Sequence, residues 1–308
     1  MEYRSLGRTG LEVSVVGMGC WAIGGDAWGP VDDRDSIAAI ERALDLGINL
    51  FDTADVYGRG RSEDLVGRAL NGRRDNAVIA TKVGLWHSGG ERPNAYTDPE
   101  MVLESCEASL RRLRTDRIDV YQCHLWWDEN TEVFVEAFEK LKADGKIRAF
   151  GVSTNEVGHL KNFNRNGTCD VLQFDYSVLN RSPEKELLPY ARERRIGTLA
   201  RGSLRMGILT GKFTTASTFP EGDIRRGWPQ QDWFPEQLGK TDRLRALAGD
   251  DRSLAQIALA FVLEHPAVST TIPGAKNPRQ VEHNAAAAAV RLSDEDRRSI
   301  DEVAPPPE

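Results

Sequence analysis

Four side chains capable of acid–base chemistry lie close to the ends of successive apolar segments. Asp52, Lys82 and His124 each end one of three such segments, and Tyr57 follows Asp52 by five residues. Each of the four has an ordinary structural role: an aspartate can cap a turn, a lysine can bind a carbonyl, a tyrosine can pack, and a histidine can form a hydrogen bond. Packing alone gives no reason to gather these four types at neighbouring strand ends. We therefore interpret them as one candidate catalytic group.

The chemistry that suits this group is proton transfer to a carbonyl oxygen. A free tyrosine titrates near pH 10, and an ammonium about 4 Å away attracts its phenolate by roughly 4 kcal/mol at an effective dielectric constant near 20. Lys82 is therefore expected to lower the pKa of Tyr57. A partly buried lysine loses its own proton unless a carboxylate holds it charged, a role that suits Asp52. His124 can hydrogen-bond the carbonyl oxygen and orient it.

These side chains need elements that bring strand ends to one rim. Eight short apolar segments alternate with amphipathic helical patterns, and they predict strands over 13–19, 48–52, 77–82, 118–124, 147–153, 171–174, 197–201 and 268–272. Since the composition does not change along the chain, this alternation favours an α/β fold with one domain over 1–308, a closed (β/α)₈ TIM barrel. The barrel would place all reactive groups at the carboxyl ends of its strands.

Smaller features extend this prediction. The turn at 7–10 predicts an N-terminal β-hairpin, and 293–303 predicts an extra C-terminal helix. A segment at about 214–240, rich in Pro, Gly, Trp and charge, is expected to form a long loop that acts as a lid. The alternative fold is a doubly wound open sheet, because Gly17 and Gly19 resemble a dinucleotide fingerprint. That fingerprint must open a helix, whereas glycines and a proline follow here.

Composition narrows the function classes. The 308 residues carry a formal net charge of −7, so a nucleic-acid partner is not expected. No apolar run of membrane-spanning length and no signal-peptide pattern occurs, which predicts a cytoplasmic protein without a membrane partner. The four cysteines form no C-x-x-C pair and indicate neither a disulfide framework nor a metal site. The oligomeric state cannot be inferred from the sequence.

Positive charge is nevertheless concentrated after the last two strands. Arg201, Arg205 and Lys212 follow the seventh strand, and Lys276 and Arg279 follow the eighth. Phosphate sites in (β/α)₈ barrels are commonly built from these two loops. The sequence therefore predicts a phosphate-bearing cofactor at this position, although a solvated charged face explains Arg205 and Arg279 equally well.

Taken together, these motifs closely resemble the aldo-keto reductase superfamily. The tetrad resemblance is carried by Asp52-Thr53-Ala54 with Tyr57-Gly58, by Lys82, and by His124 after 120–123. Further matches lie at 7–11, 151–153, 207–212 and 272–275, and the resemblance runs from about 6 to 284. It implies a (β/α)₈ barrel that uses NADP(H) or NAD(H) without a Rossmann domain and passes a hydride between nicotinamide and a carbonyl. Tyr57 would be the general acid in reduction and the base in oxidation.

The resemblance also assigns cofactor-binding residues. The nicotinamide carboxamide would be held by Ser153 and Gln173, with Thr154 or Asn155 assisting. The pyrophosphate would be lined by Ser203, Leu204 and Gly207. The adenosine end would be held by Gly274, Lys276, Gln280 and Asn284, and the set of cofactor residues also includes Arg201 and Lys212. Lys276 is the expected partner of a 2′-phosphate, which favours NADP(H) and leaves NAD(H) possible.

The chain departs from the family pattern at two of these positions. Arg201 stands where many members place a tyrosine under the nicotinamide, so that ring stacking is lost or replaced by the guanidinium plane. Thr154 stands where the family usually has an asparagine, and Asn155 follows one residue later. These departures leave open how the nicotinamide is held.

The tryptophans predict an aromatic mouth over the tetrad. All seven fall in expected loops after strands, and the candidate pocket residues are Trp21, Trp28, Trp86, Trp126 and Trp127. For Trp228 and Trp233, in the long insert, packing between loops is an equally good explanation. An aromatic mouth suits an aromatic aldehyde or the CH face of a sugar.

Three functions are compatible with these features of the sequence. The first is NADP(H)-dependent reduction of a small aldehyde, ketone or sugar carbonyl to the alcohol. The second is an NAD-dependent dehydrogenase that oxidises a sugar or polyol. The third is a cofactor-binding regulatory protein, because potassium-channel β subunits share this fold and tetrad.

Overall fold

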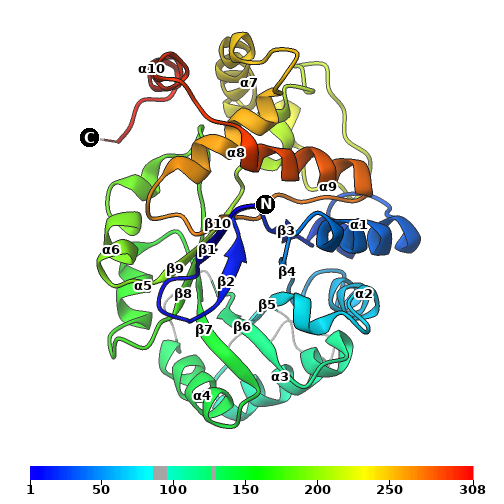
Figure 1. The fold of residues 1–308 in the computed structure, drawn as a ribbon, viewed down its shortest axis with the longest axis vertical. Helices are drawn as coiled ribbons and strands as arrows, with labels where there is room; N and C mark the ends of the chain where they lie inside the picture. Colours follow the sequence, from blue (N-terminus) through cyan, green and yellow to red (C-terminus); the bar gives the residue numbers. More distant parts are fainter. Residues whose placement is uncertain (86–95, 126–129, 308) are drawn as a thin grey trace.

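The computed structural model describes residues 1–85, 96–125 and 130–307, and its central element is an eight-stranded parallel sheet. The strands follow one another around the sheet in chain order (Figure 1): β3 (Met18–Gly19), β4 (Leu50–Asp52), β5 (Val78–Val83), β6 (Ile118–Cys123), β7 (Ile147–Ser153), β8 (Val171–Asp175), β9 (Gly197–Arg201) and β10 (Thr270–Thr271). Parallel bridges from Val16 to Thr271 and from Gly19 to Gly274 join the first strand segment to the last. The predicted (β/α)₈ barrel is confirmed, and the open-sheet alternative is wrong.

Helices surround the strands (Figure 1): α1 (Asp33–Asp45), α2 (Arg61–Ala69), α3 (Pro99–Leu113), α4 (Thr131–Ala143), α5 (Val157–Phe163), α6 (Leu187–Glu193), α7 (Trp233–Leu244), α8 (Leu254–Glu264), α9 (Pro278–Ala285) and α10 (Asp294–Val303). Their first turns are capped locally. Asp98 accepts a hydrogen bond from the backbone of α3, which has a proline at its first position, and Ser253 forms a capping box on α8. In the described part of the chain, none of the helices has the length and apolar character needed to span a bilayer.

Side-chain alternation along the strands divides the barrel interior into two ends. At the amino ends of the strands the interior is apolar and buried: Leu50, Val78, Ala80, Val120, Ala149, Val171, Leu199 and Ile272. Residues two positions further along a strand face the same side. Towards the carboxyl ends the same interior face therefore carries polar groups: Asp52, Lys82, Gln122, Gln173 and Arg201.

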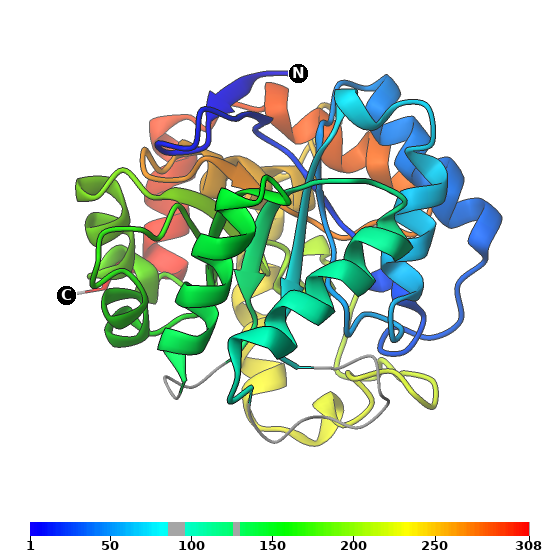
Figure 2. The same cartoon turned by 90° about the horizontal axis from the view of Figure 1, so that it is seen from below.

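The amino-terminal hairpin closes the apolar end. Its strands β1 (Tyr3–Ser5) and β2 (Glu12–Ser14) pair antiparallel, and Leu6, Leu11 and Val13 belong to the interior apolar cluster. Figure 2 shows the hairpin at one end of the barrel and the segment around 215–235 at the other. The polar end is thus the end at which a site can form.

Two predicted elements need correction. The expected strand 13–19 is divided, because β2 belongs to the hairpin whereas β3 holds only the last two residues; the Ser14 hydroxyl donates to the carbonyl of Val16 where the chain turns. The run is buried throughout, so hydrophobicity alone cannot reveal this division. The expected loop 214–240 ends early, since a 3₁₀ turn forms at Trp228–Gln230 and α7 begins at Trp233.

Candidate active site

Lys82 is the centre of the polar end of the barrel. Its ammonium donates to Asp52 Oδ2 at 2.9 Å, to Tyr57 Oη at 3.1 Å and to the carbonyl of Thr53 at 2.7 Å. A lysine ammonium has three protons, so these hydrogen bonds use all of them. The Lys82 side chain is fully buried, and Asp52 and Tyr57 are nearly so. The structure thus brings together three of the four predicted catalytic side chains by direct hydrogen bonds.

The strand register and one tight turn produce this arrangement. β4 and β5 are adjacent parallel strands, with Asp52 opposite Ala80, so Lys82 lies just beyond Asp52 on the same interior face. After β4 the chain turns, and the amide of Tyr57 donates to the carbonyl of Ala54 at 3.2 Å. Gly58 continues the turn with φ +61°, and a Cβ there would lie 2.3 Å from a neighbouring backbone oxygen. Only glycine permits this close approach.

His124 completes the group from the next strand. It follows β6, and its backbone amide donates to the carbonyl of Val83 at 2.8 Å. Its ring lies 6.1 Å from the ring of Tyr57, with the two planes nearly perpendicular. All four predicted tetrad residues therefore meet at one end of the barrel.

Burial controls the protonation of the tetrad. Burial opposes the charge on Lys82, but Asp52 and Tyr57 outweigh it and raise the pKa of the lysine. For Tyr57 the burial effect exceeds the opposing effect of Lys82, so the pKa of the tyrosine is raised. Lys82 lowers the pKa of Tyr57 as expected, but burial of the phenolate raises this pKa by more, so the net shift is upward. Burial, with Lys82 and Arg201, holds the pKa of His124 well below its usual value.

The residues expected at the nicotinamide end lie on the strands next to the tetrad. Ser153 pairs with Gln173 across β7 and β8, and Gln173 donates its amide to Asp52 Oδ1 at 2.7 Å. The Thr154 hydroxyl accepts from the backbone of Glu156 at 3.1 Å. Asn155 accepts from the backbone of Asp175 at 2.8 Å and from the Arg201 guanidinium at 3.3 Å. Both residues that could assist in binding the carboxamide thus have local hydrogen bonds.

The loop after β9 has an unusual backbone. Ser203 accepts a hydrogen bond from the Thr271 hydroxyl at 2.7 Å, which ties this loop to β10. Leu204 follows, and then Arg205, Met206 and Gly207 have φ values of +47°, +50° and +99°. Left-handed conformations at two successive non-glycine residues cost free energy and are typical of functional loops.

The residues expected at the adenosine end lie close together after β10. The backbone amide of Lys276 donates to the Gln280 side chain at 2.8 Å, and Asn284 donates to the carbonyl of Gly274 at 3.3 Å. The Lys276 ammonium also donates to the carbonyl of Trp28, on the loop after β3. This segment is therefore tied to the loop after the neighbouring strand β3.

Three cations gather near this segment. Burial and the charge of Arg225 lower the pKa of both Lys212 and Lys276, and Lys212 contributes further to lowering that of Lys276. The carboxylate of Asp223 binds Arg225 through two hydrogen bonds, at 2.8 and 2.6 Å. The three cations are exposed or only partly buried, and a bound anion would relieve the repulsion among them.

Two residues of the site, Arg225 and Gln122, were not predicted from the sequence. Arg225 belongs to the long insert, where a single arginine among other charges gives no distinguishing signal; its guanidinium lies 4.8 Å from the Trp28 ring. Gln122 lies beside Lys82 in register, and its buried amide has no hydrogen-bond partner in the described part of the chain. A polar residue in the middle of an apolar strand was the available signal for Gln122.

One of the predicted pocket tryptophans stacks on Tyr57, and a second packs against the first. The ring of Trp21 stacks on that of Tyr57 at 5.7 Å, and Trp28 contacts Trp21 edge-on at 5.1 Å. Trp86, Trp126 and Trp127 lie outside the described residues. Trp228 and Trp233 contact each other at 5.2 Å within the insert's own apolar cluster, which favours their packing role. They begin helical turns, contrary to the expectation that every tryptophan lies in a loop.

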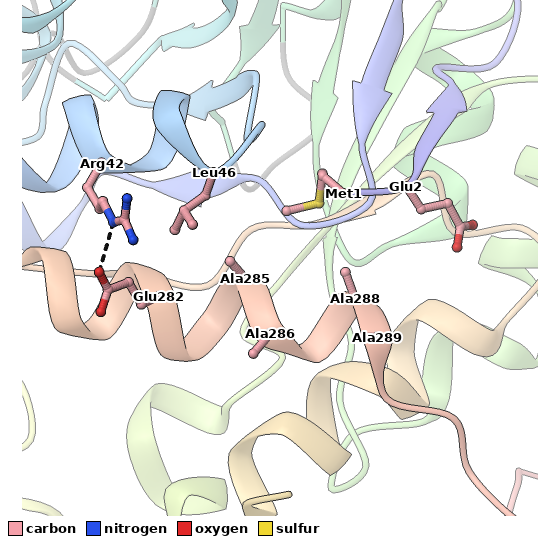
Figure 3. A pocket seen from close by; sticks show the side chains of 9 residues that line it. All are labelled: Met1, Glu2, Arg42, Leu46, Glu282, Ala285, Ala286, Ala288 and Ala289. Atoms are coloured by element: carbon pink, nitrogen blue, oxygen red, sulfur yellow. Dashed lines mark hydrogen bonds and ion pairs between the residues drawn. The ribbon is translucent and has the colours of Figure 1, made fainter. Parts of the chain in front are cut away.

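A separate groove lies at the hairpin end. It measures about 440 Å³ and is lined by the first two residues, the end of α1 with Leu46, α9 and the 3₁₀ turn Ala286–Ala289 (Figure 3). The lining includes the Arg42–Glu282 ion pair at 2.8 Å. No tetrad residue lines it. In the described part of the chain, no cluster of three or more histidine, cysteine or acidic side chains is suited to a metal ion.

Comparison with known proteins places this geometry in a family. The model of the aldo/keto reductase family matches residues 15–305. Aldo-keto reductase YhdN of Bacillus subtilis is 38% identical, over 98% of this chain and 93% of its own. The NADH-specific methylglyoxal reductase of Escherichia coli is 34% identical, over 99% and 98%. An aldo/keto reductase from Klebsiella pneumoniae, solved in complex with NADP and acetate, is 32% identical with a TM-score of 0.75, over 96% and 93%. The chain therefore belongs to the aldo/keto reductase family.

Proposed function

We propose that this protein is an NADP(H)-dependent reductase that converts the carbonyl of a small aldehyde, ketone or sugar to the alcohol. The observation that carries this proposal is the shared ammonium, since Lys82 hydrogen-bonds both Tyr57 and Asp52. A buried tyrosine held in this way can donate a proton and leave a stabilised anion. The Escherichia coli relative, a methylglyoxal reductase, supports a small carbonyl compound as the substrate class.

In this mechanism Tyr57 is the general acid. Its raised pKa keeps it protonated at neutral pH, and its hydroxyl donates the proton to the substrate oxygen. The Lys82 ammonium stabilises the phenolate that forms, and Asp52 keeps that ammonium charged and in place. His124 is neutral because of its low pKa and offers one N–H that orients the carbonyl oxygen. The cofactor, when bound, supplies the hydride.

The chain's own residues fit a dinucleotide with an additional phosphate. Lys212, Arg225 and Lys276 bring three positive charges close to the single carboxylate of Asp223, so phosphate groups would relieve their repulsion. Ser153 and Gln173 would hold the nicotinamide carboxamide, and Lys276 would bind the 2′-phosphate. The NADP complex of the Klebsiella pneumoniae relative supports NADP(H), while the NADH-specific relative keeps NAD(H) as a second cofactor.

We place the protein in the reducing cytoplasm, where it would act on freely diffusing small molecules. All four of its cysteines are free and buried. This state is ordinary for cysteines of a reducing compartment.

The test is a panel of aldehydes, ketones, aldoses and polyols, assayed with each cofactor by the absorbance of the reduced nicotinamide. We expect carbonyl reduction with NADPH to be faster than with NADH. Faster oxidation of polyols with NAD⁺ than reduction of any carbonyl would instead support a physiological dehydrogenase. Tight binding of NADPH without turnover of any compound would support a regulatory protein.

A further inference from the structure

Arg201 is a partly buried cation at the polar end of the barrel. It ends β9, two residues after the interior residue Leu199, so its side chain leaves the strand on the interior face. Its guanidinium donates to the neutral amide oxygen of Asn155 at 3.3 Å. Among the residues that the structure describes, no carboxylate forms an ion pair with it. The neutral amide of Asn155 does not compensate the positive charge of Arg201.

The neighbouring carboxylate is engaged elsewhere. Asp175 lies directly opposite Arg201 in the register of β8 and β9. Its Oδ2 accepts from Arg205 at 3.4 Å and from Asn180 at 3.2 Å. Gly202, with φ +70°, makes room for this orientation, because a Cβ there would lie 2.0 Å from Asp175 Oδ1. The Asp175 carboxylate is thus paired with Arg205 and Asn180, and within the described residues it forms no ion pair with Arg201.

The charge of Arg201 acts on the space beside the tetrad. Burial is the largest effect on both pKa values, and it raises that of Tyr57 and lowers that of His124. The charge of Lys82 lowers both pKa values, and the charge of Arg201 lowers both further. Within the tetrad the charges of Asp52 and Lys82 cancel, and the other two groups are neutral. The interior therefore carries one excess positive charge at the place where a hydride would be transferred.

We propose that Arg201 makes this site discriminate between the two oxidation states of its nicotinamide cofactor. The inference rests on the proposed function, since it requires a bound dinucleotide. The oxidised nicotinamide ring is a cation and the reduced ring is neutral, while the rest of the molecule is the same in both forms. A fixed cation beside the tetrad repels only the oxidised ring. The protein would thus take up reduced cofactor preferentially and release the oxidised form readily, which favours reduction where both forms compete.

The test is equilibrium binding rather than turnover. The affinities for NADPH and NADP⁺ are measured by titration calorimetry for the unmodified protein and for Arg201→Gln, Arg201→Lys and Lys276→Ala. In Arg201→Gln we expect the preference for NADPH over NADP⁺ to fall about tenfold, mainly through tighter NADP⁺ binding, as is reasonable for loss of a partly screened charge. Arg201→Lys keeps the charge and should keep most of the preference. Lys276→Ala is the matched control, because it should weaken the binding of NADPH and of NADP⁺ equally.

Two results would overturn the proposal. One is an unchanged NADPH to NADP⁺ preference in Arg201→Gln, with both affinities shifted together. The other is an unchanged preference accompanied by a raised KM only for carbonyl compounds that carry a carboxylate, which would make Arg201 a substrate-anion site. If the unmodified protein binds neither cofactor, the proposed function itself fails, and that result is distinct from either of these.

Discussion

The amide nitrogen of Gln173 lies 2.7 Å from Oδ1 of Asp52, while Oδ2 of the same carboxylate accepts from Lys82 at 2.9 Å. Asp52 is therefore fixed from two sides, by a lysine of β5 and by a glutamine of β8 on another part of the barrel wall. The residue expected to contact the nicotinamide also holds the carboxylate of the tetrad. The proposed cofactor contact and the position of the Lys82 ammonium would thus be linked through the Gln173 side chain.

The first prediction concerns this link. Replacing Gln173 by methionine removes the donor to Asp52 and should lower stability by about 1–3 kcal/mol, since the carboxylate loses a buried hydrogen bond. Urea unfolding measures this loss. Ser153→Ala on the paired strand is the control, because it removes a hydroxyl without touching Asp52. Equal stability of Gln173→Met and the unmodified protein would contradict the assignment.

The second prediction concerns the buried ion pair. Lys82→Met leaves Asp52 without its cationic partner and should lower the free energy of unfolding by about 3–5 kcal/mol. Combining it with Asp52→Asn removes the uncompensated charge and should recover a substantial part of that loss. Urea unfolding of both variants tests this. A double variant no more stable than the single one would mean that the charges of Asp52 and Lys82 are not coupled.

The third prediction concerns the pH profile of reduction. Reduction needs Tyr57 protonated, and burial raises its pKa, so kcat/KM should remain level through neutral pH and fall only above the usual tyrosine range near 10. On the acid side, protonation of His124 should have no effect until well below its usual pKa near 6.5. An acid limb centred near 6.5 would show that the His124 ring is hydrated rather than buried. The measurement is kcat/KM for one aldehyde across pH with saturating NADPH.

The fourth prediction concerns the cation cluster. Lys276→Ala should weaken NADPH binding about tenfold, as expected for one charge-assisted contact of about 1.5 kcal/mol, and leave NADH binding nearly unchanged. Lys161, on α5 and outside the cluster, provides the matched control as Lys161→Ala. Fluorescence titration with both cofactors decides the point. Loss of affinity for both cofactors to the same degree would place Lys276 elsewhere than at the 2′-phosphate.

Local sequence signals predicted the regular elements well. The strands at 147–153 and 197–201 have the predicted bounds, because each is a short apolar run between clear turn signals. The prediction of one strand over 13–19 is wrong for the opposite reason. Its apolar run continues unbroken from the hairpin into the barrel, and the change of partner strand depends on tertiary contacts that no local pattern encodes.

The tetrad was predictable because Asp52, Lys82 and His124 lie at strand ends and Tyr57 lies in the turn after one of them. The strand ends of a parallel barrel meet at one rim. The protonation of Tyr57 was not predictable from the sequence. The direction of its pKa shift depends on whether the effect of burial or that of Lys82 is larger, and burial is a property of the folded chain. Arg225 was missed for the same reason. Its position beside Trp28 results from the way the insert folds back, where the amide of Ile224 donates to the carbonyl of Ala27 at 3.0 Å.

The central claim is that Tyr57 is the proton donor of a carbonyl reductase, and one measurement tests it most directly. Purified protein and Tyr57→Phe are loaded with NADPH and mixed with methylglyoxal in a stopped-flow instrument, and nicotinamide oxidation is followed over a single turnover. We expect the rate in Tyr57→Phe to fall by about 10²–10⁴-fold, the usual contribution of a general acid, with NADPH affinity unchanged. A rate in Tyr57→Phe within a few-fold of the unmodified protein would contradict the account.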